Sequence, residues 1–471
     1  MTQHARIEKN AEPSASTHLA NFAAALRFED IPTPVLERAK LHILDALGCG
    51  LASNAYAFAG RVAAGAAAHD EAGSCHLIGR SERLPVRDAA LVNGVLLHGL
   101  DFDDTHLNSI VHPTAACLPV ALSFGELLKV HGSALLTAYA AGMETAIRIG
   151  LVVKGGFHHV GFHATGVVAH FSSAITAAKL LGLDAAQMMM AQGIAASTAS
   201  GVQVFLEEGA WTKRLHPGWA AVAGITAARL AANGFVAPSR PLEGKFGLLE
   251  THLQAHANEA DIGAVAAGLG SKWHLADTAM KPYPVCHFIH GCADAAILLH
   301  HELAGEEIAA VEALLPQPTL HIVAEPAAQK EHPTSDYEAK FSTQFVVAAC
   351  LLKGGFGLPD LQPEALADPQ VLALSARVRC GVDPDTAFPT YFSGGVTVTT
   401  QSGRKLTRHV RVNSGAGERM LQQQDVVAKF MASASLSVPR DKAERIRDAV
   451  LRLEAISVEE LMRTLSLAPE N

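Results

Sequence analysis

The segment HGLDFDDTHLNSIVHPT, residues 98–114, places three aspartates and three histidines in one short stretch of chain. Carboxylates and imidazoles move protons in enzymes, and both are also common metal ligands. The segment therefore predicts one of three things: an acid/base site, a metal site, or a solvated corner between two helices.

Spacing within this segment predicts which side chains act together. If the apolar helix expected over residues 86–100 continues through Thr105, then His98, Asp101 and Thr105 share one of its faces. Asp104 would lie beside Asp101, and two carboxylates so close raise one pKa unless cations are near. We expect Asp103 and His106 only to cap and solvate the corner.

His112 is followed by Pro113, which suits the first turn of a new helix. A helix N-terminus carries partial positive charge, which favours a neutral imidazole and an anionic ligand. His112 is therefore a candidate for proton transfer.

Two further segments bring cations. AWTKRLHPGWAA (210–221) has Lys213 and Arg214 before a Pro-Gly turn and an apolar helix, where a carboxylate or phosphate site could form. MKPYPVCHFIHG (280–291) has Lys281, Tyr283 and His287 in or after a rigid, proline-bounded stretch. An ordinary solvated turn and a buried helix start are the structural alternatives.

A fourth segment, GGFHHVGFHATG (155–166), places His163 in a glycine-rich loop. Glycines let a backbone approach a ligand closely, or simply let it turn.

Cofactor and metal signatures are missing from the sequence. It contains no GxGxxG after a strand, no Walker loop, no GxSxG elbow and no HExxH, and no second acidic motif accompanies DFDD. The remaining side chains suit cofactor-free, metal-free proton chemistry on a small polycarboxylate. Two other classes stay open. One is a metal-dependent helical hydrolase using Asp101, Asp104, His106 and His112, and the other is a non-catalytic carboxylate-binding protein.

Composition limits the partners. Net charge is −9, and no basic stripe suggests nucleic-acid binding. No uninterrupted apolar run has the length of a membrane span, and the polar start MTQHARIEKNAEPSAST lacks a signal-peptide core. The seven scattered cysteines fit reduced thiols. We expect a cytoplasmic protein without membrane or nucleic-acid partners.

The order of elements predicts a mainly α protein with two domains. Residues 1–16 are expected to be a flexible tail, and residues 17–270 contain one apolar helix after another, including 32–53 and 86–100. A smaller α+β domain is expected over 271–414, with a hairpin at 394–412. Residues 415–471 are again helical and are expected to return to the helical domain.

Four motifs taken together resemble the MmgE/PrpD family, which includes 2-methylcitrate dehydratase, cis-aconitate decarboxylase and iminodisuccinate epimerase. They are HGLDFDDTH…HPT, WTKRLHPGWAA, GLGSKWH and KPYPVCHFIH, in this order, and the resemblance runs from about residue 18 to about 460. It implies a large all-α domain, a smaller α+β lid domain, a cleft between them, a homodimer and no cofactor.

The resemblance also implies site residues. Positions matching the decarboxylase branch are Asp101, Thr105, His112, His163, Lys213 and Lys281. One position departs from that branch: a tyrosine expected there has its counterpart near Ala327, and Tyr337 follows ten residues later.

We therefore predict a cofactor-independent lyase that removes a proton next to a carboxylate of a small di- or tricarboxylic acid and expels water, as in 2-methylcitrate dehydration. Decarboxylation and epimerisation are the alternatives on the same scaffold. Predicted catalytic residues are Asp101, His112, Lys213 and Lys281. Predicted substrate-binding residues are Thr105, His163, Asp104, Arg214, Tyr283 and His287.

Overall fold

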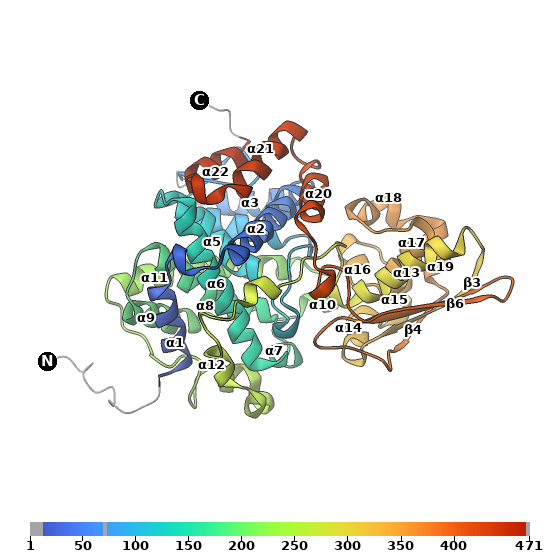
Figure 1. Cartoon of the computed structure of the whole chain (residues 1–471), viewed down its shortest axis with the longest axis horizontal. Coiled ribbons are helices and arrows are strands. Elements are labelled where there is room, and N and C mark those ends of the chain that lie inside the picture. The colour runs from blue at the N-terminus through green and yellow to red at the C-terminus, as the bar shows by residue number, and fades with distance from the viewer. Residues whose placement is uncertain (1–12, 69–72, 468–471) are drawn as a thin grey trace.

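The computed structural model describes residues 13–68 and 73–467 of the chain. Helices dominate it, and the described residues form one two-stranded and one four-stranded sheet (Figure 1). The predicted mainly α fold class is confirmed. The predicted tail falls largely on residues 1–12, which lie outside the described residues, and the first helix already begins at Ala15.

Helices are the main regular elements among the described residues before 270. They are α1 (Ala15–Ala25), α2 (Thr33–Ser53), α3 (Ala57–Ala67), α4 (Val86–His98), α5 (Pro113–Leu127), α6 (Gly132–Val153), α7 (Gly156–His159), α8 (Ala164–Leu180), α9 (Ala185–Ala196), α10 (Phe205–Glu208), α11 (Thr212–Ala232) and α12 (Leu248–Leu253). A small hairpin of β1 (Cys75–His76) and β2 (Arg83–Leu84) precedes α4.

Helices α5, α6, α8 and α11 pack on one another and form the centre of this part. By length and composition α6 is apolar enough to cross a membrane, but 94% of its most apolar window is buried inside the fold. Its side chains therefore fill the core, as their uniformly apolar character predicted.

Two glycines let α4 and α11 approach closely. A Cβ on Gly94 would lie 2.5 Å from the Cα of Gly218, and a Cβ on Gly218 would lie 2.4 Å from the carbonyl oxygen of Leu91. Any larger side chain would push the helices apart. This contact brings the start of α11, with Lys213, to the end of α4, where Asp101 follows.

The remaining strands form one sheet in the order β4-β3-β5-β6. Strands β3 (Ile308–Leu315) and β4 (Val378–Val382) are parallel, whereas β5 (Gly394–Thr400) is antiparallel to β3 and forms a hairpin with β6 (Lys405–Val410). The predicted hairpin is therefore confirmed, since Ser402 and Gly403 lie in its turn.

Short helices surround this sheet, and α13, α17 and α19 lie along one of its faces (Figure 1). The helices of this part are α13 (His290–Leu303), α14 (Leu320–Val323), α15 (Ala327–Glu331), α16 (Asp336–Lys340), α17 (Thr343–Lys353), α18 (Pro363–Leu366) and α19 (Pro369–Ser375). We refer to the described residues from 283 to 410 as the sheet-containing part.

The last helices return to the N-terminal helices. Helix α20 (Gln423–Ala434) and helix α21 (Arg440–Leu451) pack on α2, and α22 (Val458–Leu465) packs on α5 (Figure 1). This packing agrees with the expected return of the chain, while the division at residues 270 and 414 stays a prediction.

Two predicted helix boundaries were wrong, and both matter for the site. Helix α4 ends at His98 and does not continue through Thr105, because Asp101 has a left-handed backbone with φ of 52°. Helix α11 begins at Thr212 and contains Pro217 inside it, so Lys213 and Arg214 lie on its first turn instead of before a Pro-Gly turn.

Candidate active site

A cavity of about 1370 Å³ lies between the helical part and the sheet-containing part. The two parts contribute different side chains to it. Asp101, Thr105, His112, His163 and Lys213 come from the helical part, and Lys281 comes from the segment that follows it. The sheet-containing part contributes Cys286, His287, Lys330, Tyr337, Phe341 and Phe392, and we call these residues the opposite wall. The predicted catalytic residues thus meet at one wall.

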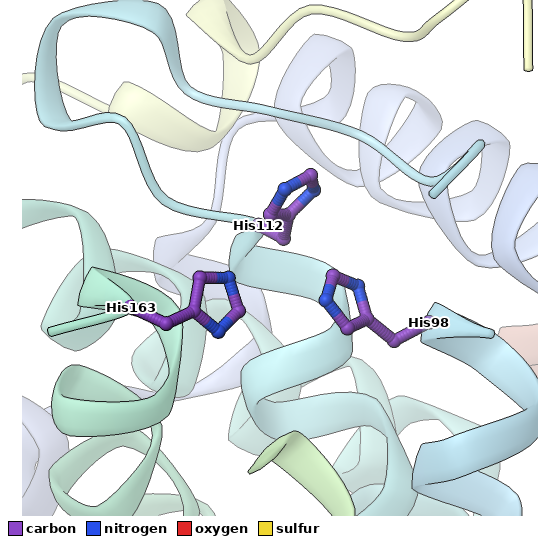
Figure 2. Close-up of side chains that lie close together, drawn as sticks. All are labelled: His98, His112 and His163. Atoms are coloured by element: carbon purple, nitrogen blue, oxygen red, sulfur yellow. The ribbon is translucent and has the colours of Figure 1, made fainter. Parts of the chain in front are cut away.

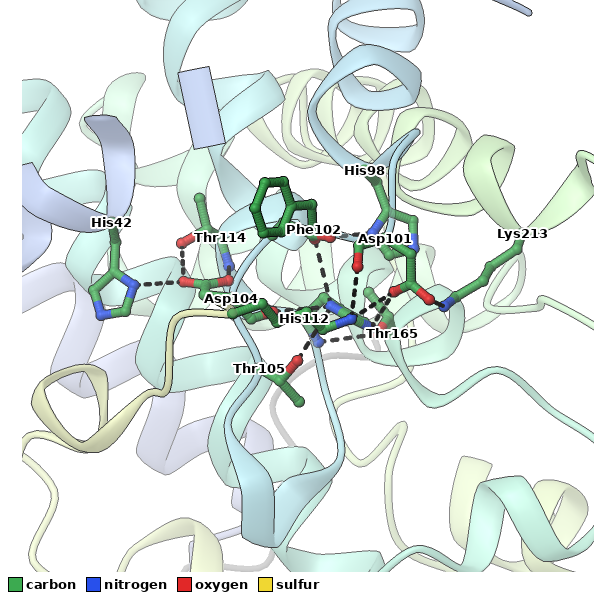
Figure 3. A network of polar contacts seen from close by, with 12 residues as sticks. His42, His98, Asp101, Phe102, Asp104, Thr105, His112, Thr114, Thr165 and Lys213 are labelled. Atoms are coloured by element: carbon green, nitrogen blue, oxygen red, sulfur yellow. Dashed lines mark hydrogen bonds and ion pairs between the residues drawn. The ribbon is translucent and has the colours of Figure 1, made fainter. Parts of the chain in front are cut away.

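Asp101 is the centre of the charged wall. Lys281 Nζ donates to both the carbonyl oxygen and Oδ1 of Asp101, each at 2.8 Å. Lys213 Nζ lies 3.0 Å from Asp101 Oδ2 (Figure 3). The left-handed backbone of Asp101 turns its carbonyl and its carboxylate toward the same lysine. Strained backbone of this kind persists only where its surroundings hold it, and it is concentrated at functional sites.

Electrostatics keep this cluster fully charged. Burial by itself would raise the pKa of Asp101, but Lys213 and Lys281 outweigh it and hold that pKa well below its usual range. Burial likewise lowers the pKa of Lys281, and the carboxylates of Asp101 and Asp103 reverse the effect so that it ends above its ordinary value. The sequence predicted that carboxylate repulsion would raise a pKa unless cations were near, and two lysines do lie beside Asp101.

His112 is fixed from both its backbone and its ring. It caps α5, its backbone N–H donates to Thr165 Oγ1 at 3.0 Å, and its ring Nδ1 lies 2.9 Å from the carbonyl oxygen of Asp104 (Figure 3). A carbonyl oxygen only accepts, so Nδ1 carries the proton and Nε2 presents a lone pair. Nε2 lies 3.7 Å from Asp101 Oδ1.

Burial lowers the pKa of His112 to about 3, against the smaller opposing effect of Asp103. His112 is therefore a neutral imidazole at pH 7 in the unliganded protein, as its place at a helix start predicted. A neutral ring with its free nitrogen beside two lysines can accept a proton, and an added polyanion would raise its pKa.

The imidazole rings of three histidines lie close together at this wall: His98, His112 and His163 (Figure 2). The ring of His98 lies 4.7 Å from that of His112 and 5.6 Å from that of His163, centroid to centroid. His98 Nδ1 lies 2.9 Å from Asp103 Oδ2, and His163 Nδ1 lies 3.0 Å from His216 Nδ1. One nitrogen of each ring lies within 4.8 Å of one nitrogen of the others.

Such a donor set suits zinc, copper or nickel by its chemistry, because Nδ1 of each ring has another partner and Nε2 is left for a metal. Lys213 and Lys281 stand in the same wall, and two cations next to the rings oppose a divalent ion. These three histidines are nevertheless one of two groups of described residues whose donor atoms lie close enough together to hold a metal, and the other is Asp101, Asp103 and His112.

The ligand set expected for a helical hydrolase is not assembled. Asp104 turns away from the cavity, where its carboxylate accepts from the backbone N–H and hydroxyl of Thr114 and lies 2.7 Å from His42 Nδ1 (Figure 3). His106 lies 3.0 Å from Ser109 Oγ. Asp104 and His106, the other two ligands of this prediction, are therefore not available to Asp101 and His112.

The chain matches two family descriptions that together cover most of its length. Residues 17–260 match the MmgE/PrpD N-terminal domain, and residues 283–455 match the MmgE/PrpD C-terminal domain. The chain belongs to the MmgE/PrpD family. Similar proteins include cis-aconitate decarboxylase of Homo sapiens, 30% identical over 95% of this chain and 94% of the relative. Cis-aconitate decarboxylase of Aspergillus terreus is 26% identical over 96% of this chain and 95% of the relative.

Three predicted substrate-binding residues of this MmgE/PrpD protein do not line the cavity. They are Asp104, Arg214 and Tyr283. Arg214 pairs with Asp336 at 3.2 Å, and the Tyr283 hydroxyl donates to Asp294 at 2.7 Å. Each is engaged by a partner outside its own motif, so spacing within the motifs gave no sign of it, and the structure places none of the three predicted contacts at the cavity.

The other three predicted binding residues do line the cavity: Thr105, His163 and His287. Thr105 arrives there on an extended segment that pairs with Ala279, not on the predicted helix face. His287 accepts at Nε2 from Asn413 Nδ2 at 2.9 Å, and burial holds its pKa well below the ordinary value.

Sequence reasoning placed His98 beside Asp101 but gave it no role in the site, and it misplaced Asp103. Asp103 is buried, not solvated, and its Oδ2 lies 2.9 Å from His98 Nδ1 and 3.5 Å from His112 Nδ1. The dense HGLDFDD stretch was a signal for these residues. Lys330 carried no motif, Tyr337 was noted only for its distance from the expected tyrosine position, and the tertiary structure places both at the cavity.

Proposed function

We propose that this protein is a carboxy-lyase that removes carbon dioxide from a small tricarboxylic acid of the cis-aconitate type. The observation that carries the proposal is the charged wall, in which Lys213 and Lys281 flank Asp101 within 3.0 Å and His112 stands beside them. The decarboxylase names of full-length relatives move our proposal from dehydration to decarboxylation.

Binding uses the lysine protons that Asp101 leaves free. An ammonium group has three donors. Lys281 donates two of its protons to Asp101 and keeps one, whereas Lys213 forms an ion pair with Asp101 Oδ2 without a hydrogen bond. The wall therefore offers charge-assisted donors from both lysines to substrate carboxylates. Asp101 pairs with both lysines and raises the pKa of Lys281.

The reaction breaks the bond between a substrate carbon and one carboxylate, which departs as carbon dioxide. The electron pair stays on the carbon skeleton and is delocalised onto a neighbouring carboxylate. Lys213 and Lys281 stabilise the charge that develops there, and preorganised donors of this kind contribute most when water is excluded. A proton then adds to a carbon of this delocalised system, so that the product has one carboxylate fewer and one carbon-bound hydrogen more.

His112 is the proton carrier in this scheme. Proton transfer was predicted for Asp101 as well, but its low pKa keeps Asp101 ionised, so it has no proton to donate and is a weak base. His112 is neutral in the empty site, and the negative charges of a bound tricarboxylate raise its pKa and let it take up a proton. That proton passes from Nε2 to the carbon, and water restores it.

Dehydration of a 2-methylcitrate-like acid, our expectation from the sequence, and epimerisation stay predictions for the same wall. In both, His112 Nε2 would take a proton from the carbon next to a carboxylate.

A panel of cis-aconitate, citrate, 2-methylcitrate and iminodisuccinate, followed by proton NMR and carbon dioxide detection, tests the proposal. We expect carbon dioxide from cis-aconitate and loss of this activity in His112→Gln, with His131→Gln as an exposed-histidine control. Loss of water from 2-methylcitrate with cis-aconitate untouched would replace decarboxylation by dehydration. No turnover of any acid would favour a carboxylate-binding protein.

A further inference from the structure

Two tyrosines of the sheet-containing part, the half-buried Tyr283 and the buried Tyr337, differ in what their hydroxyls do. The hydroxyl of Tyr283 donates to Asp294 Oδ1 at 2.7 Å, away from the cavity. Tyr337 lines the cavity and is only 4% exposed, yet its hydroxyl has no hydrogen-bond partner among residues 13–68 and 73–467. A buried polar group without a partner destabilises a fold unless a ligand or water satisfies it.

The ring of Tyr337 is held firmly. It packs against Phe341 with 5.1 Å between ring centroids and against the edge of Phe205 at 6.5 Å. The guanidinium of Arg214 lies 5.6 Å from its centroid and is itself bound to Asp336. A ring packed on three sides presents its hydroxyl in a fixed place, as a preorganised ligand contact requires.

Tyr337 also belongs to the neighbourhood of the charged wall. Phe341, which packs on it, lies beneath Lys213 Nζ at 5.3 Å. Burial, with a further contribution from the Asp101 charge, raises the pKa of Tyr337 well above its ordinary value. The phenol therefore stays protonated at neutral pH and can only donate to an anion.

We propose that Tyr337 is a substrate-contacting residue whose hydroxyl donates a hydrogen bond to a carboxylate of the acid that Lys213 and Lys281 hold. Tyr337 thereby adds a donor from the sheet-containing part to the donors of the two lysines. This inference rests on the proposed function, because it assumes a polycarboxylate in this cavity.

Tyr337→Phe and Tyr283→Phe are a matched pair of tests, since each removes one hydroxyl from a tyrosine of the sheet-containing part. For Tyr337→Phe we expect a loss of about 10- to 100-fold in kcat/KM for cis-aconitate, mostly through KM, because a hydrogen bond to a charged group is lost. The unliganded variant should melt at or above the wild-type temperature. Tyr283→Phe should melt lower, since Asp294 loses a donor, and should keep kcat/KM within about two-fold.

Equal kcat/KM in Tyr337→Phe and wild type would overturn the inference and leave the proposed function standing. A melting temperature reduced as much as in Tyr283→Phe would also overturn it, because the hydroxyl would then be structural. If wild type turns over no acid, the thermal shift given by cis-aconitate decides. A shift smaller in Tyr337→Phe than in wild type supports the contact, an equal shift overturns it, and no shift in wild type overturns both proposals.

Discussion

The two walls of the cavity are built on opposite plans. In the charged wall the central anion and the neighbouring imidazole are held by the protein itself: Asp101 pairs with two lysines, and the His112 ring bonds a backbone carbonyl through Nδ1. In the opposite wall aromatic rings surround polar groups with open positions, namely the Tyr337 hydroxyl and His287 Nδ1. A wall ordered in advance suits the chemical step, whereas open hydrogen-bonding positions suit recognition of the ligand.

The largest effect should come from the charged wall. In Lys213→Ala, Asp101 loses one cation and the substrate loses the donors of one ammonium group, so kcat should fall by about 10²- to 10³-fold. Steady-state decarboxylation with cis-aconitate measures this, and Lys245→Ala, on an exposed lysine outside the cavity, is the control. A Lys213→Ala enzyme with wild-type kcat would remove the charged wall from the chemistry.

A smaller effect on binding should come from the opposite wall. Lys330 lines the cavity and donates to the carbonyl oxygen of Ile322 at 2.8 Å. In Lys330→Met we expect KM to rise roughly five-fold with little change in kcat, because a partly exposed charge contributes modestly to attraction. A fall in kcat as large as that of Lys213→Ala would erase the contrast between the walls.

Acid should destabilise the protein through its buried histidines. The pKa of His112 is about 3 in the fold and about 6.5 in the unfolded chain, so the unfolded state binds the extra proton. The contribution of His112 is complete above about pH 6.5 and is lost as pH falls toward 3, by at most about 1.4 kcal/mol per pH unit. Thermal melts from pH 8 to 4 should show a shallower decline for His112→Gln than for wild type. Parallel curves would contradict the buried neutral imidazole.

Removing metal should have the smallest effect. The charged wall needs no metal for the scheme above, so dialysis against EDTA should leave kcat unchanged, as elemental analysis alongside would document. Stoichiometric metal, lost with EDTA and restoring activity when returned, would assign His98, His112 and His163 to a metal centre instead.

The sequence was a good guide where local patterns decide structure. Helix α2, the helix start at Pro113 and the β5–β6 hairpin follow from proline placement, apolar spacing and a Ser-Gly turn. Segments with Asp101, His112, Lys213 and Lys281 stood out because their polar residues interrupt apolar surroundings, and all four side chains meet at the cavity.

The sequence did not predict the partners that these side chains have in the fold. No local pattern indicates that Asp104 pairs with His42, Arg214 with Asp336, or Tyr283 with Asp294. The left-handed turn at Asp101 was also missed, because an aspartate after an apolar helix gives no sign that the helix will stop. Tyr337 lines the cavity, and it belongs to none of the four motifs that indicated the family.

One single-turnover experiment in deuterated water tests the central claim most directly, that His112 delivers a proton while the two lysines hold the acid. Wild type with cis-aconitate should release carbon dioxide and form a product with one deuterium bound to carbon. His112→Gln should do so about 100-fold more slowly. A product without deuterium, or a His112→Gln rate equal to that of wild type, would contradict the account.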